Sequence, residues 1–178
     1  MTDGDFQARA RALRWLLTDV DGVLTDGRMY YGAEGEALKV FHVRDGLALK
    51  MAQRAGLGVG LLSARGGPAV EHRARELGLD LTLLRTRDKL ATFRTFLKEQ
   101  GLAAGEVAFI GDDLPDLKVL EVCGLSLCPA DAALPVQEAV HHVLDRPGGL
   151  GAVREAVEKI LAARGELEAA IARFRQDR

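Results

Sequence analysis

Cysteine is scarce in this chain of 178 residues, which contains only Cys123 and Cys128. A structural disulfide is not expected in a reducing compartment, and a zinc site would need more ligands at closer spacing. We therefore expect both cysteines to be buried as small apolar side chains. The chain also lacks an apolar run long enough to cross a bilayer and an N-terminal segment ordered like a signal peptide. These absences predict a cytoplasmic protein with no membrane partner.

An excess of positive charge is lacking too. The formal net charge is -2 and the pI is about 6.1, whereas nucleic-acid binding usually requires a basic face. We expect no nucleic-acid partner, and any attraction of an anionic substrate must be local. The apolar share of 48% and the charged share of 28% are ordinary for a globular protein. The length suits a single domain over residues 1–178.

Short apolar runs alternate with amphipathic segments along most of the chain. Such alternation is typical of βαβ units and predicts an α/β fold with a Rossmann-like, doubly wound parallel sheet. The expected strands lie at 13–18, 59–63, 80–84, 106–110, 124–128 and 141–145, and the expected helices at 46–55, 68–77, 88–100, 114–122, 132–139 and 150–163.

Two segments depart from this alternation. Residues 26–44 contain the β-like runs RMYY and LKVFHV around the turn sequence GAEGE, which predicts a small β-hairpin insertion and leaves no room for a large cap domain. Residues 165–178 form an amphipathic tail, in which Leu167, Ile171 and Phe174 share one helical face.

Residues that could bind a metal ion or a phosphate, or take part in catalysis, follow four successive expected strands. Ligands of parallel sheets bind at the carboxyl ends of the strands, and acids placed there are costly unless a cation or hydrogen bonds compensate them. Carboxylate oxygens suit Mg²⁺. A helix cap or turn would explain one or two of these acids, but not two acidic clusters at strand ends. The residues are Asp19, Asp21, Gly22, Ser63, Lys89, Asp112, Asp113 and Asp116.

The joint pattern DxDGVLT…S…K…GDDxxD resembles the four motifs of the haloacid dehalogenase superfamily of phosphatases. Longer stretches, among them VRDGLALKMAQRAGLGVGLLSAR and GGLGAVREAVEKIL, resemble the phosphatases of 3-deoxy-D-manno-octulosonate (KDO) 8-phosphate over about residues 13–168. The chain departs from that family's usual pattern at Ala64, at Leu150 and in the RTR segment before Asp88.

The resemblance implies a sheet of the haloacid dehalogenase type, without a large cap. It also implies Mg²⁺-dependent hydrolysis of KDO 8-phosphate to KDO and phosphate in lipopolysaccharide biosynthesis. The assembly it implies is a homotetramer whose active sites are completed by neighbouring subunits.

Resemblance and chemistry assign the same catalytic roles. Asp19 attacks phosphorus and forms an aspartyl-phosphate, and Asp21 serves as general acid and then general base. Asp19, the backbone carbonyl of Asp21 and Asp112 hold Mg²⁺, while Lys89 compensates the remaining charge.

The substrate-binding residues are expected to include groups for the phosphate and groups for the carboxylate of the sugar acid. Ser63 and the amides near Gly22 hold phosphate oxygens. Arg65 is the first candidate for the sugar carboxylate, with Arg73 and Arg44 as weaker candidates. In the outer shell, Asp113 and Asp116 orient metal-bound water or Lys89.

Three other functions remain open from the sequence. The same chemistry could serve an N-acylneuraminate 9-phosphate or a related nine-carbon sugar-acid phosphate. A non-catalytic, phosphatase-like regulatory module would usually have lost one of the key residues, all of which are present here. A phosphotransferase or mutase would usually carry a larger cap that excludes water.

Overall fold

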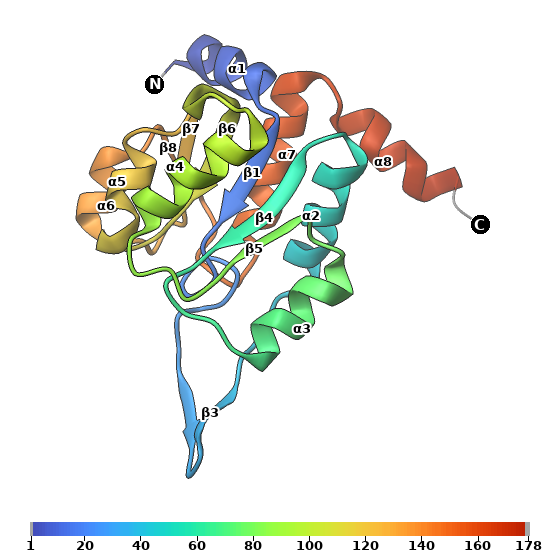
Figure 1. Cartoon of the computed structure of the whole chain (residues 1–178). Coiled ribbons are helices and arrows are strands. Elements are labelled where there is room, and N and C mark those ends of the chain that lie inside the picture. The colour runs from blue at the N-terminus through green and yellow to red at the C-terminus, as the bar shows by residue number, and fades with distance from the viewer. Residues whose placement is uncertain (1, 177–178) are drawn as a thin grey trace.

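A six-stranded parallel sheet forms the centre of the computed structural model, which describes residues 2–176 (Figure 1). The strand order is β5-β4-β1-β6-β7-β8, so the chain builds outwards from β1 in one direction and then in the other. This confirms the doubly wound sheet. The point at which the strand order reverses direction, the topological switch point, lies at β1. The strands are β1 (Trp15–Thr18), β4 (Gly58–Leu62), β5 (Leu81–Leu83), β6 (Val107–Ile110), β7 (Leu125–Cys128) and β8 (His142–Val143).

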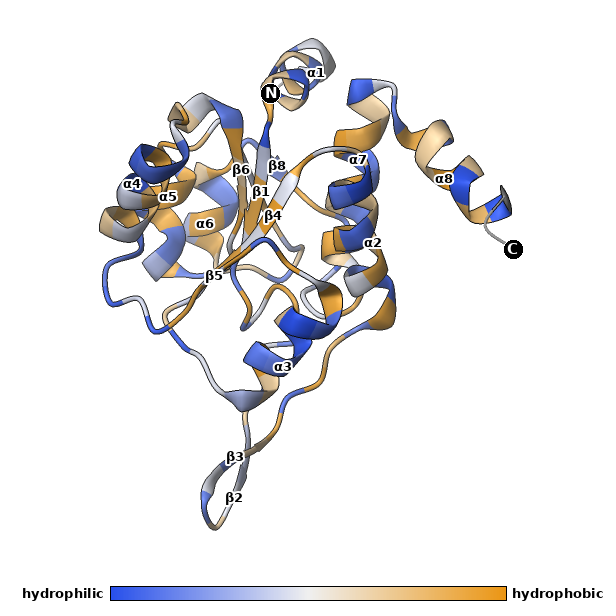
Figure 2. Ribbon diagram, turned by 45° about the vertical axis from the view of Figure 1, so that its right-hand side comes forward, coloured by the Kyte–Doolittle hydropathy of each residue, from blue (hydrophilic) through white to orange (hydrophobic). Residues whose placement is uncertain are grey.

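Helices cover both faces of the sheet, with their apolar sides turned towards it (Figure 2). Because side chains alternate along a strand, Leu16 joins one core cluster and Leu17 the other. The Leu16 side is covered by α2 (Val43–Arg54), α3 (Pro68–Leu77) and α7 (Ala152–Arg164). The Leu17 side is covered by α4 (Lys89–Gln100), α5 (Leu117–Leu120) and α6 (Leu134–Ala139), and the short 3₁₀ turns η1 (Ala104–Glu106) and η2 (Leu114–Asp116) flank β6.

An N-terminal helix, α1 (Asp3–Ala12), was not expected from the sequence. It begins with a capping box, in which the Thr2 hydroxyl accepts from the Asp5 amide and the Asp5 carboxylate accepts from the Thr2 amide. Its apolar side is small, with Ala10 fully buried and Phe6 partly buried. Packing against α7 stabilises a helix whose weak periodicity gave little signal.

The predicted hairpin projects beyond the carboxyl ends of the strands (Figure 1). Its strands are β2 (Tyr30–Gly32) and β3 (Gly35–Leu38), and Gly32 pairs with Gly35 across a two-residue turn. The expectation that the second run spans residues 38–43 was wrong, because Gly35, at φ 117°, lets the chain turn earlier. Phe41 then leaves the hairpin to pack against the core.

The tail forms α8 (Leu167–Gln176) and packs on its own chain. Leu167 and Ile171 contact the core cluster. Arg173 donates a 2.6 Å hydrogen bond to the Arg54 carbonyl, and the Arg54 guanidinium lies 5.2 Å from the centre of the Phe174 ring. Residue 1 of the predicted domain and residues 177–178 of the predicted tail lie outside the described residues.

Between residues 2 and 176, the structure contains no helix both long and apolar enough to span a membrane.

Candidate active site

Lys89 brings two strand ends together at the centre of the sheet edge. Asp19 directly follows β1, Asp116 lies in η2 beyond β6, and Lys89 is the first residue of α4. The Lys89 Nζ atom donates to Asp19 Oδ2 at 2.7 Å and to Asp116 Oδ1 at 2.6 Å. All three residues are buried, with exposures of 8% or less. Burial by itself lowers the pKa of Lys89, but Asp19 and Asp116 outweigh it and raise that pKa.

Asp116 is positioned by the loop that carries the second acidic cluster. Its Oδ2 atom accepts from the Asp112 amide at 3.0 Å and from the Asp113 amide at 3.3 Å. A Cβ atom on Gly111 would lie 2.6 Å from the Asp116 Cβ, so this approach requires glycine. Asp116 thus contacts Lys89, and the expectation that it orients this lysine stays a prediction. Asp113 is exposed and its carboxylate accepts from the Leu114 amide at 2.8 Å, which caps η2.

Three carboxylates converge closely enough to share a cation. One oxygen from each of Asp19, Asp112 and Asp116 lies within 4.8 Å of the others. Within residues 2–176, the buried Asp112 Oδ1 atom has no hydrogen-bond partner, and such an orphan is costly unless a cation satisfies it. Burial and the nearby Asp19 raise the pKa of Asp112 to about 8, and burial also raises that of Asp19. The donor set therefore fits a hard divalent cation.

Gly22 allows the first acidic loop to approach the second. It has φ 89°, and a Cβ atom there would lie 2.0 Å from Asp112 Oδ2. Two neighbouring glycines, Gly148 and Gly149, lie on the loop before α7 and pack against the Gly22 loop from outside. The approach is so close that a Cβ atom on Gly148 would lie 1.8 Å from the Gly22 carbonyl oxygen. Next to it, the Gly149 amide donates to the Val23 carbonyl at 2.9 Å. The GGLG stretch carries part of the family resemblance, but its sequence gave no sign of this packing role.

Asp45 was missed by the sequence analysis, although it lies in the quoted VRDG stretch. It is 1% exposed and accepts from the Gly151 amide at 3.2 Å and the Arg154 amide at 2.8 Å. These bonds attach the start of α2 to the start of α7, directly after the glycine pair. Burial raises the pKa of Asp45, although the two backbone bonds oppose that rise.

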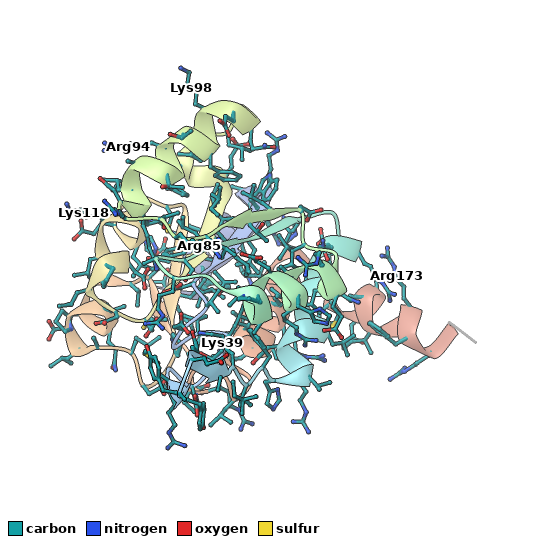
Figure 3. The ribbon with its side chains drawn as sticks, turned by 60° about the horizontal axis from the view of Figure 1, so that its bottom comes forward. Lys39, Arg85, Arg94, Lys98, Lys118 and Arg173 are labelled. Carbon is teal, nitrogen blue, oxygen red and sulfur yellow. The ribbon has the colours of Figure 1, made fainter. Side chains whose placement is uncertain are left out.

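The hairpin contributes two further residues that the sequence analysis missed, Glu36 and Lys39. Lys39 donates to Asp21 Oδ1, and its Nζ atom lies 3.0 Å from Glu36 Oε1. Its side chain is only 5% exposed. In Figure 3, Lys39 lies over the middle of the molecule on the hairpin side, whereas Lys98 and Arg173 lie at its outline. A lysine inside the mostly apolar run LKVFHV was the available signal.

The remaining predicted residues are divided between the site and its surroundings. Ser63 is 2% exposed directly after β4, and its hydroxyl accepts from the Arg65 amide at 3.3 Å. The Arg65 Nε atom lies 3.7 Å from Asp21 Oδ2. Arg73 instead pairs with Glu76 at 2.9 Å and rests against Gly46 of α2.

Comparisons with known proteins identify relatives of this chain, although the chain matches no protein-family model. It is 44% identical over 160 residues to the 3-deoxy-D-manno-octulosonate 8-phosphate phosphatase KdsC of Haemophilus influenzae, covering 90% of this chain and 89% of that protein. The cobalt-bound structure of the H. influenzae phosphatase has a TM-score of 0.88 at 43% identity, covering 90% of this chain and 94% of that one. The Moraxella catarrhalis 3-deoxy-D-manno-octulosonate 8-phosphate phosphatase, in complex with magnesium, phosphate and KDO, has a TM-score of 0.93 at 33% identity, covering 96% and 98%.

The doubly wound sheet, the strand-end aspartates and these relatives define a phosphatase of the haloacid dehalogenase superfamily without a large cap. This confirms both the predicted fold class and the predicted enzyme class. The chain belongs to the family of 3-deoxy-D-manno-octulosonate 8-phosphate phosphatases.

Proposed function

We propose that this phosphatase hydrolyses KDO 8-phosphate to KDO and phosphate through a phosphorylated Asp19. The observation that carries the proposal is the buried Asp19 carboxylate at the switch point, held by Lys89 and facing Asp112. The M. catarrhalis relative, crystallised with magnesium, phosphate and KDO, supports the substrate.

Asp19 is the nucleophile of the proposed reaction. Its Oδ1 atom accepts from the Val20 amide at 2.6 Å and its Oδ2 atom from Lys89, so the carboxylate is fixed in orientation. One of these oxygens bonds to phosphorus while the bond from phosphorus to the sugar oxygen breaks. Lys89 offsets negative charge as the phosphoryl group approaches.

Asp21 moves the protons. It gives one to the departing sugar oxygen and then takes one from the water that cleaves the aspartyl-phosphate. Its Oδ1 atom is occupied by Lys39, whereas the buried Oδ2 atom has no hydrogen-bond partner among residues 2–176. The nearby Arg65 Nε atom, at 3.7 Å, is beyond hydrogen-bond distance, so Oδ2 is the oxygen available for this proton.

A divalent cation is supported by the converging carboxylates and by the metal-bound relatives, and we propose Mg²⁺. Asp19, Asp112 and the backbone carbonyl of Asp21 would hold it. When bound, it neutralises charge between the nucleophile and the phosphate. Ser63 and the amides near Gly22 would bind the phosphate oxygens.

Substrate choice gives the first prediction. We expect higher kcat/KM for KDO 8-phosphate than for generic sugar phosphates, with Arg65 binding the carboxylate. Arg65→Ala should lower kcat/KM for KDO 8-phosphate by roughly tenfold or more, because a charge-assisted bond is lost. Arg94→Ala, on the exposed side of α4, is the matched control.

Steady-state kinetics with KDO 8-phosphate, an N-acylneuraminate 9-phosphate and ribose 5-phosphate measure this choice. An unchanged specificity ratio in Arg65→Ala removes that role from Arg65. Faster turnover of the nine-carbon acid phosphate would favour the second candidate, which the Arg65 carboxylate site equally supports. A non-catalytic module finds no support among relatives named as phosphatases.

Assembly gives a second prediction, a homotetramer whose neighbouring subunits complete the active sites. The projecting hairpin exposes more apolar surface than an isolated flap usually carries, and the exposed residues are Met29, Tyr30, Tyr31, Leu38 and Val40. A closed symmetric assembly would cover it. Light scattering should give about four times the chain mass of 19.2 kDa.

The family resemblance also implies that the C-terminal tail reaches towards the active site of a neighbouring subunit, and truncation tests this role. Cutting after Ala163 would also remove Leu167 and Ile171 from the core, so a cut after Arg173 is the sharper test. It removes Phe174, which is 40% exposed. We expect the shortened protein to keep its thermal stability within a few degrees but to change in KM or selectivity. A fully active monomer contradicts the assembly, and a tetramer indifferent to the cut contradicts only the tail's role.

A further inference from the structure

Four charged side chains, one of them that of the proposed acid/base residue Asp21, form a closed ring. This charge ring consists of Asp21, Lys39, Glu36 and Arg65, in which carboxylates and cations alternate. Lys39 contacts both Asp21 and Glu36, the latter at 3.0 Å. Arg65 closes the ring at 3.7 Å from Asp21 Oδ2 and 3.5 Å from Glu36 Oε2.

The members of the charge ring come from three separate segments. Asp21 lies on the loop after β1, Glu36 and Lys39 on or beside β3, and Arg65 on the loop after β4. The ring therefore connects the projecting hairpin to the two loops that carry the candidate catalytic residues. Its side chains are 5% to 42% exposed, so Lys39 is nearly withdrawn from water while Arg65 remains accessible.

Glu36 has a particular place in this ring. Each of its two carboxylate oxygens faces a different cation, Oε1 facing Lys39 and Oε2 facing Arg65. A carboxylate is thus already held between two cations, directly beside the residue that must protonate the leaving sugar oxygen. The proposed substrate also carries a carboxylate, on the sugar that leaves.

We propose that Glu36 substitutes internally for the substrate's carboxylate, and that the sugar acid displaces it from between Lys39 and Arg65. This rests on the proposed function, because it assigns the carboxylate subsite of that reaction. Lys39 and Arg65 together bind the carboxylate, and Glu36 occupies their position when no acid is bound.

The exchange favours acidic substrates for an electrostatic reason. One carboxylate replaces another, so both cations keep a partner throughout. A sugar phosphate without a carboxylate must either leave Glu36 in place, which narrows the site, or displace it and leave the nearly buried Lys39 with less compensation. Selectivity thus comes partly from a penalty on the wrong substrate.

Two substitutions test the proposal in the full-length protein. Glu36→Gln removes the competing charge with little change in volume and should lower KM for KDO 8-phosphate by about three- to tenfold, because more of the protein is ready to bind. Lys39→Met should raise that KM by roughly tenfold or more, since a charged hydrogen bond is lost. It should also lower the ratio of kcat/KM for KDO 8-phosphate to that for ribose 5-phosphate.

Matched controls and a second readout separate this proposal from the proposed function. Glu34→Gln, in the exposed turn of the same hairpin, and Lys98→Met, on the exposed part of α4, control for charge. Calorimetry with free KDO should show tighter binding to Glu36→Gln and weaker binding to Lys39→Met, whether or not KDO 8-phosphate is the substrate.

The two failures are therefore distinct. A wild-type protein that does not prefer KDO 8-phosphate overturns the proposed function. A Glu36→Gln variant that binds KDO more weakly than wild type, or equally, shows that Glu36 supports the hairpin rather than competes with the ligand. Equal losses on both substrates in Lys39→Met would remove Lys39 from the carboxylate subsite.

Discussion

Replacing Asp19 with asparagine is expected to lower kcat by at least roughly 1,000-fold while the protein stays folded. The change removes the nucleophilic oxygen and one anionic ligand of the candidate cation site, with almost no change in volume. Lys89 keeps Asp116 as its partner at 2.6 Å, so the buried ammonium retains a counter-charge. Circular dichroism and thermal unfolding should therefore resemble those of the wild type.

Asp88→Asn is the matched control for this experiment. Asp88 is exposed, precedes Lys89 in the chain and caps α4 by accepting from the Ala91 amide at 2.9 Å. Asparagine caps helices about as well as aspartate, so this variant should keep activity within a few-fold. Turnover by Asp19→Asn within tenfold of the wild type would rule out the aspartyl-phosphate mechanism.

Removing divalent metal should reduce turnover by at least roughly 100-fold, and adding Mg²⁺ should restore it. Without a cation, Asp19 and Asp112 would face each other and the incoming phosphate, with Lys89 as the cation that contacts Asp19. Repulsion between these anions opposes phosphate binding. Full activity after thorough chelation, with no metal in the assay, would contradict the proposed site.

The same site predicts a pH dependence that does not rely on activity. In the metal-free protein, the pKa of Asp112 is raised from 3.8 to about 8, so the protonated form is favoured by folding. Its stabilising contribution is complete below about pH 3.8 and is lost as the pH rises through about 8. The raised pKa of Asp19 acts in the same direction.

Thermal unfolding measures this effect. The melting temperature of the metal-free protein should fall between pH 5 and pH 8, and Mg²⁺ should raise it more at pH 8, where the carboxylates are ready to ionise. Asp112→Asn should lose most of this dependence on pH and on Mg²⁺. An Mg²⁺ effect of equal size at both pH values would show that Asp112 is not the group responsible.

Lys39 and Glu36 illustrate what the sequence concealed. Both lie in the segment whose β-like runs predicted a hairpin insertion, and a lysine or glutamate in a hairpin is usually a solvated residue. Only the return of the chain over Asp21 buries the Lys39 side chain to 5% exposure. Asp45 was hidden for the same reason, because its partners at Gly151 and Arg154 lie more than one hundred positions further along the chain.

The sequence by itself determined the order of strands and helices, since periods of two and of about 3.6 residues are local properties of the chain. It also determined the strand-end positions of Asp19, Ser63 and Asp112 and the place of Lys89 beyond another strand, because parallel strands present their carboxyl ends at one edge. It missed α1, whose apolar face is too small to be recognised without α7.

Only the tertiary structure decided which strand-end residues touch and which stay apart. Lys89 bonds to Asp116 and not to Asp113, and Arg73 pairs with Glu76. Leu167 and Ile171 of the tail pack against the core of their own chain. The physical reason is that contacts between distant segments depend on sheet order, loop path and close glycine approaches such as Gly22 to Asp112. None of these is encoded in the period or spacing of a single segment.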